Sequence, residues 1–168
     1  MRATLPIVLM FSLLLAACGF HLRGQKAFEL PFQSLYVRSD NAYAPFITEL
    51  KHAIEENSVQ IADAPEQAQL TLHIVSEVKD RQILSLSGGG RVREYRLQYR
   101  ISLRAYDQQQ QEWLALEEIT LRRDFSYDDA QVLAKEQEEE LLYQNMRNDA
   151  VRQVLRRLNH ARPLPPKE

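Results

Sequence analysis

The chain has 168 residues, and its 21 basic and 23 acidic side chains give a formal net charge of −2 at pH 7. This charge argues against bulk attraction to nucleic acid, so an anionic partner would have to be met by a local cationic patch. The length is enough for one domain with a hydrophobic core of its own.

The N-terminal segment has the layout of an export signal. Arg2 supplies a positive charge, residues 5–15 are almost entirely apolar, and two small residues stand directly before Cys18. The apolar run is too short to span a bilayer, which takes roughly 20 residues. We therefore predict a lipoprotein signal peptide over residues 1–17 and acylation of Cys18 after cleavage; the alternative is a plain secretory signal followed by an unrelated cysteine.

Acylation of Cys18, which is the only cysteine, leaves no thiol for a disulfide, a nucleophile or a soft-metal site. The rest of the chain predicts a single domain over residues 18–162. A short apolar stretch at residues 35–37, between polar neighbours, predicts its first strand. A helix of about three turns follows from Pro45, with apolar residues at helical spacing: Phe46, Ile47, Leu50, Ala53 and Ile54.

Three further strands and a second helix follow by the same criteria. Residues 68–79 alternate and predict a half-buried strand, with Leu70, Leu72, Ile74 and Val78 on the core face. The alternation is clearest over residues 91–106, where Tyr95, Leu97, Tyr99, Ile101 and Leu103 form the core face. A polar turn leads to a fourth strand over residues 113–125.

Asp128 and Asp129 are expected to cap a long last helix, in which apolar residues recur four apart: Leu142, Met146, Ala150, Val154 and Leu158. The tail, residues 163–168, holds three prolines and is expected to be disordered.

The order strand, helix, three strands, helix predicts an α+β fold: a mixed four-stranded sheet with two helices packed on one face. The first helix joins its flanking strands most easily as a parallel crossover, and the last three strands form an antiparallel meander. The other face of the sheet is expected to stay open, because a strand covered on both sides would be continuously apolar. Such a face is either solvated or a docking surface for another protein.

Catalytic chemistry finds little support. The four histidines, at positions 21, 52, 73 and 160, show no metal-ligand spacing, and no serine lies in a G-x-S-x-G turn. Residues 88–90 are glycines without the Lys-Ser/Thr of a phosphate loop, so they predict a flexible turn. We therefore expect no enzyme activity, metal site or cofactor. A lipid-anchored hydrolase remains the alternative that detectable ester or glycan turnover would support.

A local cationic stretch stands out in the acidic chain. The glycine-rich loop ends in Arg91 and Arg93, and with Arg96, Arg100 and Arg104 it gives five arginines against one acid, Glu94. Guanidinium groups bind phosphate in bidentate fashion, so this stretch suits a phosphorylated lipid headgroup. A solvated face is the alternative for the three arginines within the strand.

The residues that would begin the mature chain are more specific. The string Cys18-Gly19-Phe20-His21-Leu22-Arg23-Gly24 resembles the mature N-terminus of the LPS-assembly lipoprotein family, LptE, also called rare lipoprotein B. Glu94-Tyr95, at the start of a strand, and Leu133-Ala134-Lys135-Glu136, at the start of the last helix, are similar to the same family. The likeness extends over nearly the whole chain.

The resemblance implies an outer-membrane lipoprotein that plugs the lumen of the β-barrel LptD from the periplasmic side. It further implies support for that barrel's assembly and for insertion of lipopolysaccharide into the outer leaflet, by binding alone. By motif position, the lipopolysaccharide-binding lysine is Lys135 and the arginine is Arg91 or Arg93, with Arg91 favoured. Gly19 resembles the outer-membrane sorting pattern. An adaptor lipoprotein for another outer-membrane oligomer is the alternative.

Overall fold

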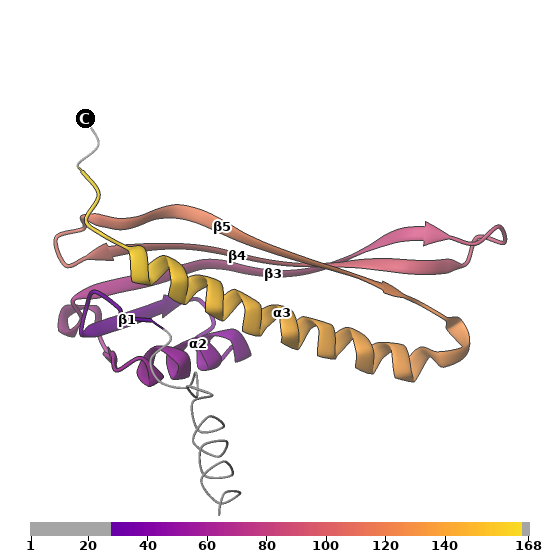
Figure 1. The fold of residues 1–168 in the computed structure, drawn as a ribbon, viewed down its shortest axis with the longest axis horizontal. Helices are drawn as coiled ribbons and strands as arrows, with labels where there is room; N and C mark the ends of the chain where they lie inside the picture. Colours follow the sequence, from indigo (N-terminus) through magenta and orange to yellow (C-terminus); the bar gives the residue numbers. More distant parts are fainter. Residues whose placement is uncertain (1–27, 166–168) are drawn as a thin grey trace, which may run out of the picture.

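The computed structural model describes residues 28–165, which form one long, curved sheet with helices along one side (Figure 1). In chain order the elements are β1 (Ser34–Ser39), α2 (Pro45–Glu56), β2 (Gln60–Ile61), the 3-10 turn η1 (Pro65–Gln67), β3 (Leu70–Leu86), β4 (Val92–Asp107), β5 (Glu112–Ser126), the 3-10 turn η2 (Asp129–Gln131) and α3 (Val132–His160). The predicted signal peptide and Cys18 lie outside the described residues. In the predicted tail, Leu164 N–H donates to Glu112 O at 2.7 Å.

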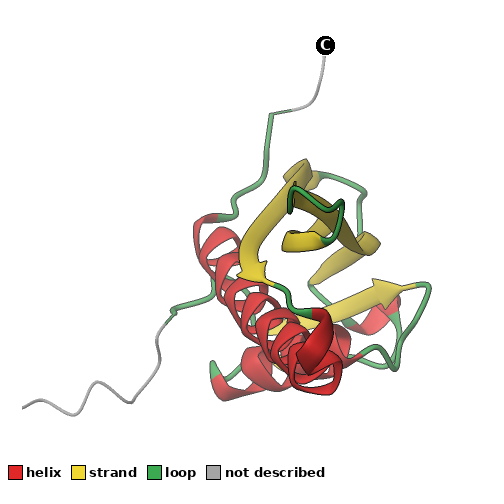
Figure 2. Cartoon of the chain, turned by 90° about the vertical axis from the view of Figure 1, so that its right-hand side faces the viewer, coloured by secondary structure: helices red, strands yellow, loops and turns green. Residues whose placement is uncertain are grey.

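The sheet order is β2-β1-β3-β4-β5, with β1 parallel to both β2 and β3, and β3, β4 and β5 antiparallel. Both helices lie on the same side of the curved sheet (Figure 2). The predicted α+β fold with a mixed sheet is therefore confirmed. The sheet has five strands rather than four, because Gln60 and Ile61 pair with β1. A strand of two residues is too short for an alternating pattern to reveal it.

The core lies between the sheet and the two helices. Its fully buried side chains come from every layer: Leu35, Phe46, Leu50, Ile54, Leu72, Leu97, Tyr99, Ile101, Met146, Val154 and Leu158. The rings of Phe46 in α2 and Tyr99 in β4 meet edge to face, with centroids 6.4 Å apart. The predicted helical and strand spacings therefore correctly identify the buried faces of α2, β4 and α3.

Strand β3 differs from the prediction in its length and in the residues that face the core. It runs to Leu86 rather than residue 79 and pairs with β4 over almost its whole length. A bulge between Ile74 and Ser76 inserts one residue, which reverses the faces of residues 76–83; two further register shifts follow, between Ile83 and Ser85 and between Ser85 and Leu86. Val78, predicted to be buried, is instead 37% exposed, and Glu77 accepts a hydrogen bond from the buried Tyr99 hydroxyl at 2.6 Å.

The two ends of this elongated structure differ. At one end lie α2, β1 and the β4–β5 turn; we call this the proximal end. At the other end lie the β3–β4 turn and the start of α3; we call this the distal end (Figure 1). The predicted capping of α3 by Asp128 and Asp129 is wrong: α3 begins after Gln131, which makes no side-chain cap hydrogen bond. Asp128 Oδ1 instead accepts a hydrogen bond from Ala130 N–H (3.0 Å) and caps η2, the turn that leads into α3 and contains Asp129.

Candidate functional site

The β3–β4 turn places Arg91 at the distal tip of the molecule. Ser87 N–H donates to Arg91 O (2.7 Å), and Arg91 N–H donates to Ser87 Oγ (3.1 Å), so the loop closes tightly. Gly90 has a φ of 77°, a left-handed backbone that glycine adopts without strain. Arg91 and Arg93 are both exposed, and neither forms an ion pair with any of residues 28–165.

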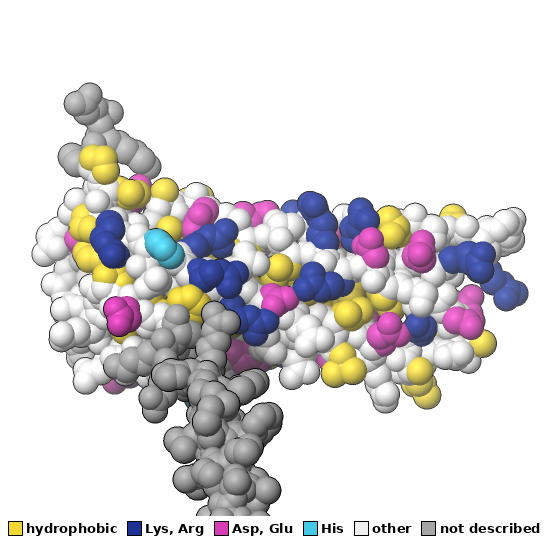
Figure 3. Space-filling view, in the orientation of Figure 1, with side chains coloured by type: hydrophobic (Ala, Val, Ile, Leu, Met, Phe, Trp, Pro, Cys, Tyr) yellow, Lys and Arg dark blue, Asp and Glu magenta, His cyan; other side chains and the backbone are white. Residues whose placement is uncertain are grey.

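Large apolar side chains are exposed around these arginines. In β3, Ile83 is 59% exposed and Leu86 is 55% exposed, and at the start of α3 Leu133 is 77% exposed. We call these three residues, with Arg91 and Arg93, the distal patch. In the space-filling view, basic side chains stand at the distal tip and hydrophobic side chains are exposed along the same half (Figure 3). Cationic and apolar groups side by side suit an amphiphilic partner.

Lys135 lies at the same end but is not a free cation. Tyr127 N–H donates to Arg93 O (2.8 Å), and Lys135 Nζ donates to Ser126 Oγ (3.2 Å), so the start of α3 is held beside the β3–β4 hairpin. Lys135 also pairs with Glu138 at 2.8 Å, and only 15% of its side chain is exposed. To bind an anion, Lys135 must either keep its ion pair with Glu138 and contact the anion as well, or break that ion pair.

Aromatic packing supports the hairpin from the helix side. The Tyr95 ring stacks on Phe125 at 5.9 Å and meets Tyr127 edge to face at 5.0 Å. The Arg81 guanidinium lies 4.6 Å from the Tyr95 centroid and pairs with Glu139 of α3 at 2.8 Å. The hydrogen bond that Arg81 donates to the Glu139 carboxylate raises the pKa of Arg81 above its ordinary value. Arg81 is not among the site residues predicted from the sequence, although its place in the alternation that continues after Lys79 could have indicated it.

The remaining arginines of β4 do not join Arg91 in one site. Arg91 and Arg104 are about 43 Å apart along the strand, at roughly 3.3 Å per residue. Arg96 forms two hydrogen bonds with Asp124, at 2.8 and 2.9 Å, which lower the pKa of that carboxyl and raise the pKa of Arg96. The predicted stretch of five arginines is therefore divided between the distal tip and the open face of the sheet.

The described residues offer no support for a metal centre or a membrane-spanning helix. No group of three or more His, Cys, Asp or Glu side chains within residues 28–165 could hold a metal ion. No helix in this part of the chain is both long enough and apolar enough to cross a bilayer.

Comparison with known proteins identifies the family. The family model described as LptE, lipopolysaccharide-assembly, matches residues 32–158. The chain belongs to the LptE family. The LPS-assembly lipoprotein LptE of Pectobacterium atrosepticum is 29% identical over 147 residues, covering 87% of this chain and 79% of that protein. That of Yersinia enterocolitica is 28% identical over 151 residues, covering 87% of this chain and 70% of the relative.

Solved structures of similar proteins have the same fold. Lipoprotein B of Nitrosomonas europaea superimposes with a TM-score of 0.72 and 39% identity, covering 84% of this chain and 90% of that one. Rare lipoprotein B of Shewanella oneidensis superimposes with a TM-score of 0.65 and 28% identity, covering 73% of this chain and 91% of that one. A minor lipoprotein of Acinetobacter baumannii is similar in fold, with a TM-score of 0.66 at 23% identity, covering 82% of this chain and 99% of that one.

These matches confirm the family predicted from the N-terminal string, although the family model itself begins only at residue 32. Members of the LptE family are lipopolysaccharide-assembly lipoproteins of the outer membrane. The roles of Cys18, Arg91, Arg93 and Lys135 stay predictions.

Proposed function

We propose that this protein is an outer-membrane lipoprotein, acylated at Cys18, that binds and plugs the LptD β-barrel. In that position it supports the assembly of the barrel and assists the transport and insertion of lipopolysaccharide into the outer leaflet. Membership of the LptE family supports a role in lipopolysaccharide assembly. The observation that supports the rest is the distal patch, where two arginines that form no ion pair with residues 28–165 lie at the same end as exposed apolar side chains.

The chemistry of the distal patch suits a phosphorylated glycolipid. A guanidinium binds phosphate through two parallel hydrogen bonds, so Arg91 and Arg93 would hold the headgroup phosphates. Ile83, Leu86 and Leu133 offer apolar surface beside them. Lys135 contacts Ser126, which lies opposite Glu94 in the sheet, and Arg91 follows about 10 Å farther along the strand. A headgroup with more than one phosphate could therefore engage both cations.

The protein acts here by binding, with no bond made or broken. The domain is elongated and two-layered (Figure 1), and Gln98, Arg100 and Ser102 of β4 alternate with its core residues, so the open face there is polar. Such a domain suits a plug that remains partly hydrated inside a barrel. A lipid anchor at Cys18 would keep the domain at the membrane surface and so raise its effective concentration at the barrel.

The first test is affinity purification of the C-terminally tagged chain from detergent-solubilised outer membranes. We expect one large β-barrel protein to co-purify in equal amount. Recovery of the chain alone, or with a different oligomer, would contradict the plug and favour the adaptor lipoprotein.

The second test measures lipopolysaccharide binding by charge reversal. We expect R91E to weaken binding about tenfold or more, since a hydrogen bond to a charged group contributes roughly 1.5–3 kcal/mol. R93E and K135E should have smaller effects, K135E because Lys135 is already paired with Glu138. R122E is the matched control, because Arg122 is an exposed arginine of β5 that forms no ion pair with residues 28–165. If R91E and R122E weaken lipopolysaccharide binding equally, the effect comes from the net charge of the protein and not from a contact of Arg91.

A further inference from the structure

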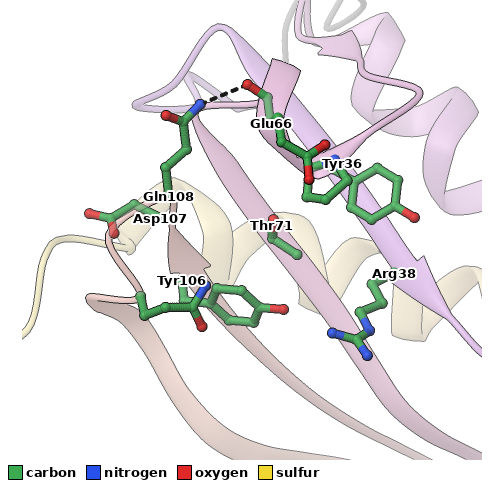
Figure 4. A pocket seen from close by; sticks show the side chains of 9 residues that line it. Tyr36, Arg38, Glu66, Thr71, Tyr106, Asp107 and Gln108 are labelled. Carbon is green, nitrogen blue, oxygen red and sulfur yellow. Dashed lines mark hydrogen bonds between the residues drawn. The ribbon is translucent and has the colours of Figure 1, made fainter.

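A pocket of about 410 Å³ lies on the open face of the sheet at the proximal end, far from the distal patch. Its floor is a row of three side chains in register across three strands: Tyr36 of β1, Thr71 of β3 and Tyr106 of β4. Figure 4 shows Tyr36 and Tyr106 on either side of Thr71, with Arg38 at one end. The volume is within the range of small-molecule sites.

The walls of this pocket are held in place by hydrogen bonds. Gln108 Nε2 donates to Glu66 O (3.1 Å) and Ala68 O (3.0 Å), which ties the β4–β5 turn to η1 (Figure 4). The Asp107 carboxylate accepts from two backbone N–H groups at 2.9 Å and from Trp113 Nε1 at 3.2 Å. The pocket is therefore already formed in the absence of a ligand.

The lining of the pocket has unused hydrogen-bonding groups. Thr71 is only 5% exposed and Tyr106 only 9%, yet neither hydroxyl forms a hydrogen bond with any of residues 28–165. The same holds for the Tyr36 hydroxyl, the Arg38 guanidinium and the Glu66 carboxylate. The Thr71 and Tyr106 hydroxyl oxygens are not among the buried polar atoms that lack a partner, so they open onto the pocket, and Arg38 and Glu66 are exposed. All these groups are therefore available to a bound molecule or to water.

Two arginines lie on either side of His73 at one end of the pocket. The row next to the floor places Arg38, His73 and Arg104 side by side across β1, β3 and β4. The Arg104 guanidinium lies 5.4 Å from the Tyr106 ring centroid, and its Nε reaches only His73 Nδ1, at 3.4 Å. Asp40 is the acid that acts on His73 from this region. The cationic end can therefore attract an anion.

We propose that this pocket binds an acidic sugar, a single sugar ring that carries a carboxylate or a phosphate. The two tyrosine rings offer flat apolar surface to the faces of the sugar. The free hydroxyls and the Glu66 carboxylate bind the sugar hydroxyls, and Arg38 binds the acidic group in bidentate fashion. A simple anion would make no use of the Glu66 carboxylate, which accepts hydrogen bonds from sugar hydroxyls. A neutral sugar would make no use of the charge of Arg38. The site does not depend on the role of Arg91 and Lys135 at the other end.

The test is a titration of the ¹⁵N-labelled full chain, in a detergent free of sugar and phosphate, followed by NMR. Glucose 6-phosphate and glucuronate should shift the backbone signals of Tyr36, Thr71 and Tyr106. Glucose and inorganic phosphate, added separately, should bind at least tenfold more weakly. Binding of inorganic phosphate as tight as that of glucose 6-phosphate would overturn the proposal, as would the absence of shifts at these residues.

Variants separate this site from the distal patch. R38Q removes an exposed guanidinium that forms no ion pair within residues 28–165, so the variant should fold normally while binding glucose 6-phosphate about tenfold more weakly. R122Q, the matched control on the same face, and R91Q should bind it as the unaltered chain does. Unchanged binding by R38Q would overturn the proposal, whatever happens to lipopolysaccharide binding in R91E.

A further arm identifies the source of the sugar, using deacylated acidic core oligosaccharide. Binding at least tenfold tighter than that of glucose 6-phosphate, and still weakened by R38Q, supports the site with a glycolipid as the source. Equal affinity supports it with a free sugar acid as the source. Binding that R38Q does not weaken would contradict it.

Discussion

Gly90 forms the left-handed step of the β3–β4 turn, with a φ of 77°. A side chain there strains the backbone, although there is space for it, since no heavy atom lies within 4 Å of an added Cβ. We expect G90A to lower the free energy of unfolding by about 1 kcal/mol, measured by urea denaturation. G88A is the control, because Gly88 has equal space and no positive φ. Equal stability of the two variants would contradict the argument.

Arg147 and Glu49 form a partly buried ion pair between α3 and α2, with Nε and Oε1 2.8 Å apart. Only 9% of the Arg147 side chain is exposed, against 33% for Glu49. R147M leaves the Glu49 carboxylate without its partner, and we expect it to lower the free energy of unfolding by about 2 kcal/mol, less than for a fully buried pair.

The matched variant replaces both charges. R147M/E49M should recover at least half of the stability that R147M loses, because no unpaired carboxylate remains. If the double variant is no more stable than R147M, the loss reflects packing of the arginine stem and not the unpaired charge.

His73 gives the domain a dependence on mildly acidic pH. Burial lowers its pKa, and the nearby Arg38 and Arg104 lower it further against the opposing effect of Asp40. The unfolded chain therefore binds a proton at His73 more readily than the folded one, so stability falls as the pH drops below about 6.5. H73Q should lose less free energy of unfolding than the unaltered chain between pH 7.5 and 5.

The sequence predicts residue types at the distal end better than their pairing. Arg91 after three glycines is readily expected at an exposed tip, and the structure places it there. Helical spacing offers Lys135 two acidic neighbours, Glu138 at i+3 and Glu139 at i+4, and the sequence alone does not decide between them. The choice depends on how the helix turns against β5, which is a tertiary property.

At the scale of elements, the periodic faces of α2, β4 and α3 follow from the sequence, but the second half of β3 does not. The bulge after Ile74 has no signature of its own, since neither glycine nor proline marks it. Its consequence is that Glu77, Lys79 and Arg81 face α3, where Lys79 lies 5.0 Å from the Tyr143 ring centroid. Polar contacts thereby replace a hydrophobic core in the distal half.

This division predicts two levels of backbone protection within one hairpin. Residues 97–103 of β4 carry fully buried core side chains, whereas the apolar side chains of residues 83–86 in β3 are largely exposed. Segments with few buried apolar contacts open more easily. Amides of residues 83–93 should exchange with deuterium at least tenfold faster than those of residues 97–103, measured by mass spectrometry. Uniform protection would show that the hairpin opens only as a whole.

At the scale of the whole molecule, the helices cover one face of the sheet and the two candidate sites lie apart from that contact. The distal patch occupies one end, and the pocket at Tyr36 and Arg38 occupies the open face at the other end. The core holds the long sheet in shape and so fixes the separation of the two sites. A substitution in either site should leave the other, and the fold, intact.

The lipid anchor is the last whole-molecule feature to test. Replacing residues 1–18 with a secretory signal that leaves no cysteine should release the same domain without its acyl chains. Because tethering makes the encounter with the barrel effectively intramolecular, we expect about a hundredfold less barrel to co-purify at equal expression. Urea denaturation should be unchanged, since the replacement keeps every core residue of the described part of the chain, from Phe28 onward. Raising expression should restore the complex by mass action. Unchanged recovery of the barrel at low expression would mean that the contacts of the domain suffice and that the anchor serves another purpose.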